Sequence, residues 1–214
     1  MKKITAAIVL IILLSFIVGI CAYQNIQGDI IASHWNSEGN VNGYMSKFWG
    51  IFLVPLMSVG LYLLFLLIPR IDPLKKNIQK FRKEYDLFIL IFILFLFLVF
   101  VLTILTNLGY GFNMVFVIMP AIGLLFFYLG IIMKKLKRNW FIGIRTPWTL
   151  SSDIVWDKTH KLGSVLFKIM GVIFFLGILF PPKYLIWFIL VPVFIIVIWL
   201  FLYSYLEYQK IRKK

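Results

Sequence analysis

The side chains best suited to acid–base or metal chemistry are few in this sequence, and they are scattered. There are eight Asp and Glu residues and two His residues, and every acid falls in a polar connection or at the edge of an apolar run. Proton-coupled carriers and pumps place such groups at depth within their membrane spans. The sequence therefore shows no sign of a buried proton relay.

His34 and His160 lie in different polar segments, and neither has a nearby cysteine or a dense cluster of acids. Metal sites need several such ligands close together, so we expect no metal site. Near His160, Ser152 and Asp157 supply the other residue types of a hydrolytic triad, but no nucleophile elbow or oxyanion-hole sequence accompanies them. We therefore expect no catalytic residue and no cofactor, and we interpret the chain as not an enzyme. A membrane enzyme that uses His160 is a third alternative.

A polar segment at 24–47 contains several residues that favour turns. Asn42-Gly43 is a strong pair for a tight turn, because both residues tolerate a positive φ. We expect a compact flap. One interpretation is an aromatic anchor at the level of the lipid headgroups, closed by turns. The other is a recognition surface outside the cell, with polar contacts from His34, Asn36 and Lys47.

A second distinctive segment is 139–163, which is rich in tryptophan and polar residues. Pro147 disfavours helix at the residue before it, so a helix that precedes the segment cannot simply continue through it. Ser151 or Ser152 can then cap a new helix, on which Trp156 and His160 recur at four-residue spacing. We predict a short amphipathic helix at the membrane interface before the fifth span.

This second segment also has two interpretations. The first is an interfacial helix anchored by its tryptophans. In the second, Arg145 binds a partner or acts as a conformational latch, because Trp140 and Trp148 on either side of it offer rings for cation–π stacking.

The elements that must position these segments are apolar runs long enough to cross a membrane. The composition is 62% hydrophobic and only 14% charged, which is far too few charges to cover a soluble domain. A span needs about 20 apolar residues. Six windows qualify, at 4–23, 48–68, 87–106, 114–133, 163–180 and 184–203. We expect an all-α integral membrane protein with six transmembrane helices, which contacts membrane lipid.

The net charge of +14 comes from short basic clusters between the apolar runs. This distribution is typical of the positive-inside rule and not of a nucleic-acid groove, so we expect no direct nucleic-acid partner. If the first connection faces outward, 20 of the 22 Lys and Arg residues fall on the cytoplasmic side. We therefore expect a multi-pass protein of the plasma membrane with both termini in the cytoplasm.

The connections suggest two units. The first is an N-terminal membrane module at 1–86, with two spans, the flap and a basic cytoplasmic loop. The second is a four-span module at 87–214, which contains the arginine and proline of the second segment. The short connections at 107–113 and 181–183 require the spans on either side of each to pack as antiparallel neighbours.

These two segments also carry a family resemblance. The stretch from Asn139 to Gly163 contains Gly-x-Arg-Thr-Pro-Trp-Thr-Leu-Ser at 143–151 and Trp-x-x-Thr-His at 156–160. It resembles the signature of the SdpI family of bacterial and archaeal membrane proteins. The loop from His34 to Lys47 is similar to the domain of unknown function that commonly precedes that signature.

The resemblance implies an immunity and signalling protein of the membrane. Its function would be resistance to a secreted toxic peptide on the outer side, together with the holding of a transcriptional repressor on the cytoplasmic side. By the resemblance, the outer sensing surface comprises His34, Asn36, Gly39 and Lys47. The cytoplasmic motif that signals or supports the fold comprises Asn139, Gly143, Arg145, Thr146, Pro147, Trp148, Ser152, Trp156 and His160.

A small transporter or channel for an apolar or peptidic solute is the alternative to an immunity protein. It would need a continuous cavity lined by the few polar residues of the spans, such as Ser58, Thr103 and Ser164. A dry, packed bundle would favour the immunity protein.

Overall fold

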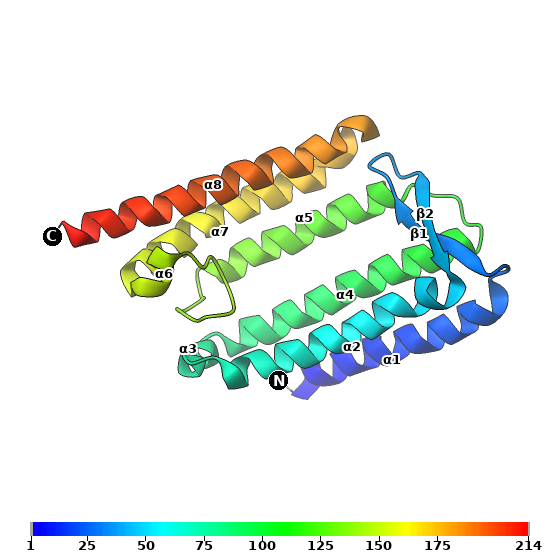
Figure 1. Ribbon diagram of the computed structural model, residues 1–214, viewed down its shortest axis with the longest axis horizontal. Coiled ribbons are helices and arrows are strands. Elements are labelled where there is room, and N and C mark those ends of the chain that lie inside the picture. Colours follow the sequence, from blue (N-terminus) through cyan, green and yellow to red (C-terminus); the bar gives the residue numbers. More distant parts are fainter. Residues whose placement is uncertain (1, 214) are drawn as a thin grey trace.

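The protein is a bundle of long helices with a small β-hairpin at one end (Figure 1). The computed structural model describes residues 2–213. Within them, six helices are long and apolar enough to cross a membrane, as the sequence predicts. They are α1 (Lys2–Asn25), α2 (Lys47–Ile71), α4 (Arg82–Asn107), α5 (Met114–Met133), α7 (Asp153–Leu176) and α8 (Leu185–Arg212). Short helices connect them: α3 (Lys75–Gln79), α6 (Pro147–Ser151) and the 3₁₀ turns η1 (Gly177–Leu179) and η2 (Pro182–Tyr184).

The long helices lie side by side in two groups, with α1, α2 and α4 in one and α5, α7 and α8 in the other (Figure 1). Contacts between α4 and α5 join the groups. Both ends of the described chain lie at the end of the bundle that holds α3 and α6, which we call the motif end. The opposite end is the hairpin end. The packing places α4 with α1 and α2, although a boundary at residue 86 assigns it to the second unit.

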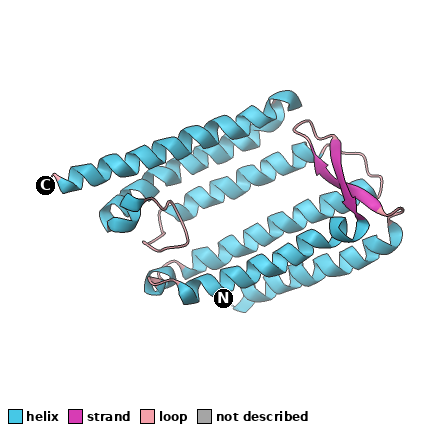
Figure 2. Cartoon of the chain, viewed as in Figure 1, coloured by secondary structure: helices cyan, strands magenta, loops and turns pink. Residues whose placement is uncertain are grey.

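The hairpin consists of β1 (Ile30–Trp35) and β2 (Val41–Ser46), paired antiparallel, and it is the one sheet in the described chain (Figure 2). The expected tight turn at Asn42-Gly43 is wrong, because both residues lie within β2. The turn lies at 36–40 instead, where the Asn36 side chain accepts hydrogen bonds from the backbone N–H groups of residues 38 and 40. The hydrogen bonds of the Asn36 side chain therefore determine the position of the turn, although Asn-Gly favours a turn by its local sequence.

The closest helix pair is α5 with α7, because glycines let the two backbones touch. A Cβ placed on Gly171 would lie 2.6 Å from the carbonyl oxygen of Gly123, and one on Gly123 would lie 2.7 Å from that of Gly171. Nearer the motif end, the Ser164 hydroxyl donates to the Gly130 carbonyl at 2.6 Å. Small residues at such crossings allow the close packing on which helix association in membranes depends.

A short helix does precede the fifth span, but it is α6, with Pro147 at its start. The residues expected to form it, from Ser152 to His160, instead begin the span itself, since α7 runs unbroken from Asp153 to Leu176. Ser152 separates the two helices in an extended conformation and caps α7. No helix breaker follows in the sequence, so the amphipathic segment and the apolar window merge.

Candidate functional site

Two clusters of polar residues lie at opposite ends of the bundle, and the sequence selected residues in both. The motif end holds 139–163, and the hairpin end holds 30–46. His160 and His34 are therefore separated by the length of the helices and cannot bind the same metal ion.

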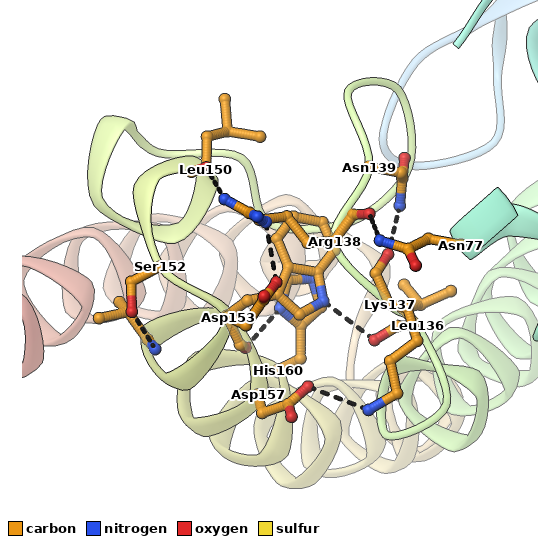
Figure 3. Close-up of polar contacts among 12 residues, drawn as sticks. Asn77, Leu136, Lys137, Arg138, Asn139, Leu150, Ser152, Asp153, Asp157 and His160 are labelled. Atoms are coloured by element: carbon orange, nitrogen blue, oxygen red, sulfur yellow. Dashed lines mark hydrogen bonds and ion pairs between the residues drawn. The ribbon is translucent and has the colours of Figure 1, made fainter. Parts of the chain in front are cut away.

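At the motif end, Asn139 organises a tight loop between α5 and α6. Its buried side chain donates to the carbonyl oxygen of Lys137 at 2.9 Å (Figure 3). It also donates to the carbonyl oxygen of Ile142 at 2.9 Å and accepts from the backbone N–H of Phe141 and Ile142. All of its hydrogen bonds are within the loop. Asn139 therefore shapes the backbone and presents no polar group to a partner.

His160 fastens this loop to α7. Its Nε2 accepts the backbone N–H of Ile144 at 3.0 Å, so the ring proton must be on Nδ1, which donates to the Trp156 carbonyl at 2.8 Å. The ring stacks on Trp156 with centroids 4.0 Å apart. Gly143 has φ +111°, and a Cβ there would collide with Nε2 of His160. The position of the His160 ring therefore requires a glycine at residue 143.

Thr146 and Trp148 connect α6 to α8. Thr146 forms a capping box with Thr149, and its hydroxyl lies 3.0 Å from that of Ser204 on α8. The Trp148 ring packs against two aromatic residues of α8, Phe201 and Tyr205. The threonine and tryptophan of the motif therefore fix the position of α8, while Pro147 begins α6.

Arg145 is exposed, and it is the charged residue of the motif. Its guanidinium donates to the Trp140 carbonyl at 2.7 Å. Among residues 2–213, cation–π contacts involve Lys47, Arg82 and Lys183 and not Arg145, so the expected stacking is not present. Arg145 and the exposed Trp140 ring nevertheless lie where a partner could reach them.

Some residues that the sequence did not point to join the motif to the first helix group. The buried carboxylate of Asp72, just after α2, accepts from the backbone N–H of Trp140 at 2.9 Å and from that of Leu74. Asn77 of α3 donates to the Arg138 carbonyl at 2.8 Å (Figure 3). These bonds tie the α2–α4 connection to the loop that Asn139 shapes.

Two charged groups complete the motif end. Arg138 donates to the Leu150 carbonyl and its Nε lies 2.8 Å from Asp153, so it joins α6 to the start of α7 (Figure 3). On α8, the buried Glu207 carboxylate pairs with Lys158 at 2.6 Å and with Lys210 at 2.7 Å. The first of these pairs joins α8 to α7.

Replacing the buried Asp72 by alanine is expected to destabilise the protein by about 1–3 kcal/mol, because the backbone N–H groups of Trp140 and Leu74 would lose their acceptor. Asp157→Ala is the matched control, since that carboxylate is mostly exposed and lies 3.4 Å from Lys137. An exposed pair of this kind contributes about 1 kcal/mol or less. Thermal unfolding of the purified variants in detergent measures both effects. Equal losses in the two variants would contradict the role given to Asp72.

At the hairpin end, three of the four residues selected from the sequence are partly buried and contact other parts of the fold. The Asn36 side chain closes the turn, and Gly39 has φ +85° where a Cβ would collide with Asn113. The Lys47 ammonium donates to the Ile26 carbonyl and lies over the Tyr23 ring. These contacts hold the hairpin in shape.

His34 is the one of the four that is exposed. Its Nδ1 lies 2.6 Å from the Asn42 side-chain oxygen, which orients the ring. Of the residues selected from the sequence at this end, His34 is therefore the one most available to a ligand.

Two asparagines at either end of the α4–α5 connection hold the hairpin, and the sequence did not point to them. Asn107 accepts the backbone N–H of Ala32 at 2.8 Å and donates to its carbonyl at 2.9 Å, as a neighbouring strand would. Asn113 donates to the Glu38 carbonyl and caps α5. Neither residue belongs to a local motif, and their partners are 75 residues away.

Replacing Asn107 by leucine is expected to loosen the hairpin, because both edge hydrogen bonds of Ala32 are lost. Backbone amides at 30–46 should exchange with solvent about tenfold faster, as expected for the loss of one or two net hydrogen bonds. Asn25→Leu is the control, since Asn25 bonds within its own helix. Hydrogen exchange measured by mass spectrometry compares the exchange rates of the two variants. Unchanged exchange at 30–46 in Asn107→Leu would contradict the assignment.

A cavity of about 380 Å³ lies beneath the hairpin, between the two helix groups. Helices α2, α4, α5 and α8 supply its walls, and residues of β1, the turn and β2 cover it. Its lining comes from the hairpin half of these helices, as far as Val99 of α4 and Ile122 of α5. The cavity therefore opens at one end of the bundle and is not a continuous passage.

The polar residues of the spans do not line such a passage either. The hydroxyls of Ser58 and Thr103 donate to backbone carbonyls of their own helices, and that of Ser164 to the adjacent α5. Only Thr103 of the three lines the cavity. The arrangement gives no support to the transporter or channel that the sequence left as an alternative.

Two parts of the chain match models of known protein families. Residues 135–204 match the SdpI/YfhL protein family, and residues 10–59 match a domain of unknown function, DUF1648. The chain is 30% identical over 212 residues to "Immunity protein SdpI" of Bacillus subtilis (strain 168), with 99% of each chain covered. No solved structure gives a significant match. Identity at this level over nearly the whole length shows that the chain belongs to the SdpI family of membrane proteins.

Proposed function

We propose that this protein confers on its cell resistance to a secreted antimicrobial peptide. The observation that carries the proposal is the 30% identity to an immunity protein over 99% of both chains. Coverage of this extent includes both the hairpin and the motif, so the two ends would retain their roles together. Resistance of this kind requires binding and no turnover, and we propose that the protein is not an enzyme.

In this proposal the hairpin end faces outward and both termini are in the cytoplasm of a plasma-membrane protein. The distribution of basic residues supports this orientation. Of the described Lys and Arg residues, only Lys47 and Lys183 lie at the hairpin end, while clusters lie at the start of α1, around α3, after α5 and at the end of α8. Short connections rich in Lys and Arg are retained in the cytoplasm.

The two ends would then have different tasks. The hairpin end, with the exposed His34 and the cavity below it, meets the peptide. The motif end presents Arg145 and Trp140 to the cytoplasm, where they bind a transcriptional repressor when the peptide is present. The remaining motif residues hold the loop, α7 and α8 in place, as their buried hydrogen bonds require.

Resistance is tested by expressing the chain in a Bacillus subtilis strain whose own SdpI has been deleted, grown in the presence of wild-type cells that secrete the toxin. The expected result is survival close to that of cells carrying their own immunity protein, and death of cells carrying an empty vector. Death of the expressing cells, with the protein present in the membrane fraction at the level of the native immunity protein, would refute the proposal.

Arg145→Ala is expected to abolish recruitment of the repressor to the membrane and to leave peptide resistance unchanged. The side chain is exposed and makes a single hydrogen bond, so its removal should cost little stability. Lys161→Ala, another exposed cation at the motif end, is the control. Fluorescence of a tagged repressor in cells treated with peptide measures recruitment. Normal recruitment in Arg145→Ala would contradict the role of this surface.

A further inference from the structure

The cavity beneath the hairpin has the composition of a binding site for an uncharged, amphipathic ligand. Its deep wall is aliphatic, with Val54, Ile118, Ile122 and Ile189. The polar groups lie on the side covered by the hairpin, where Ser33, His34, Asn36 and Ser37 contribute. A ligand with one apolar and one polar side would match both surfaces.

The size of the cavity and its mouth fit the insertion of a few large side chains. Its 380 Å³ lies in the range of about 300–1,000 Å³ that is usual for ligand pockets. Trp49, Leu53 and Ile186 both line the cavity and are exposed, so it opens on the surface of the protein. The ligand therefore has a route of entry that requires no unfolding of the hairpin.

Methionine and tryptophan give the walls an adaptable surface. Met45, Met114 and Met119 line the cavity together with Trp35 and Trp49. Methionine is unbranched and polarizable, so it fits apolar partners of irregular shape, and such surfaces are common where proteins bind the apolar face of a peptide.

The charge of the lining decides between a peptide and a membrane phospholipid as the occupant. None of the described residues that line the cavity is Lys, Arg, Asp or Glu, and the nearby Lys47 is held by the Ile26 carbonyl and the Tyr23 ring. A phospholipid phosphate is favoured by a cationic partner, which this lining does not provide. The apolar face of a peptide needs none.

We propose that this cavity binds the apolar face of the secreted peptide and so withdraws it from the lipid bilayer. The inference rests on the proposed resistance to such a peptide and names the surface that captures it. Large apolar side chains of the peptide enter between α2 and α8, and its polar side lies against the hairpin.

The test is a cavity-filling variant, Ile118→Trp, compared with Val117→Trp. The two residues are neighbours on α5, but Ile118 lines the cavity while Val117 is exposed on the outside of the bundle. With the secreted peptide purified from culture supernatant, Ile118→Trp should lower the inhibitory concentration to within about twofold of the empty vector. Val117→Trp should remain within about twofold of the wild-type chain. Wild-type resistance in an Ile118→Trp protein would overturn the inference.

A second measurement applies even if Ile118→Trp fails to fold. A photo-reactive benzoylphenylalanine replaces Trp49, which lines the cavity, or Trp187, which is exposed on α8 and does not. Irradiation with the labelled peptide should give a peptide adduct at position 49 and none at 187. An adduct with phospholipid alone at position 49, or peptide adducts of equal yield at both positions, would overturn the inference.

These outcomes separate the inference from the function on which it rests. Failure of the wild-type chain to protect cells would refute the proposed function and the inference with it. Protection by the wild-type chain together with full protection by Ile118→Trp would refute the cavity alone.

Discussion

Gly171→Leu is expected to remove most of the folded protein from the membrane, because it forces a side chain into a backbone-to-backbone contact. A Cβ at 171 would already lie 2.6 Å from the Gly123 carbonyl oxygen and 2.6 Å from the Phe127 backbone nitrogen. Neither atom belongs to a flexible side chain that can move aside. Overpacking commonly costs about 1–3 kcal/mol, and here the whole α5–α7 crossing must open, so we expect a loss at or above the upper value.

Gly60→Leu on α2 is the matched control, since nothing lies within 4 Å of a Cβ placed there. Both substitutions introduce the same side chain into a membrane-spanning helix. Size-exclusion chromatography in detergent and the level of protein in the membrane fraction measure the effect. Equal yields and equal elution profiles for the two variants would contradict the close approach of α5 and α7.

Trp156→Ala should destabilise the motif end by about 3–5 kcal/mol, the usual cost of deleting a large aromatic side chain from a core. The ring is fully buried, its Nε1 donates to the Leu136 carbonyl at 2.9 Å, and His160 stacks on it. Its loss leaves a cavity and removes one support of the histidine that holds the 139–146 loop. The loop should then detach from α7.

Trp187→Ala is the control, because that ring is exposed on α8. Thermal unfolding in detergent reports the stability of both variants, and proteolysis reports exposure of the 139–146 loop. A small loss of stability in Trp156→Ala, no larger than in Trp187→Ala, would show that the motif does not depend on this packing.

The six spans were predictable from the sequence because each depends on a long local run of apolar residues. The start of α7 was not, since hydropathy alone begins the span near Gly163 whereas the helix begins at Asp153. Trp156 and His160 are buried there and hydrogen-bonded to backbone carbonyls. Polar residues with buried partners extend a span beyond its apolar window.

The hairpin and its attachments show a second limit of the sequence. Asn42-Gly43 has a strong local preference for a turn, but the Asn36 side chain closes the turn elsewhere. Asn107 meets Ala32 across 75 residues, and Asp72 meets Trp140 across 68. Neither polar residue stands in a recognisable local pattern, and only the packing of the helices brings the partners together.

The residues selected from the sequence fall into two groups once their contacts are known. Most motif residues, such as Asn139 and His160, use their hydrogen bonds within the fold. Arg145 and His34 remain exposed, one at each end of the bundle. The resemblance pointed to both segments, but the structure was needed to separate residues that shape the backbone from residues that a ligand or partner can reach.

The most direct test of the account is the labelling of a cysteine at position 34 in intact cells. His34→Cys is made in a Cys21→Ser background, because Cys21 is exposed and would otherwise react. We predict that a membrane-impermeant maleimide labels position 34 without permeabilisation, that the secreted peptide slows the labelling, and that Arg145→Cys is labelled only in opened cells. Labelling of position 145 but not 34 in intact cells, or a rate at 34 that the peptide does not change, would contradict an outward hairpin that meets the peptide.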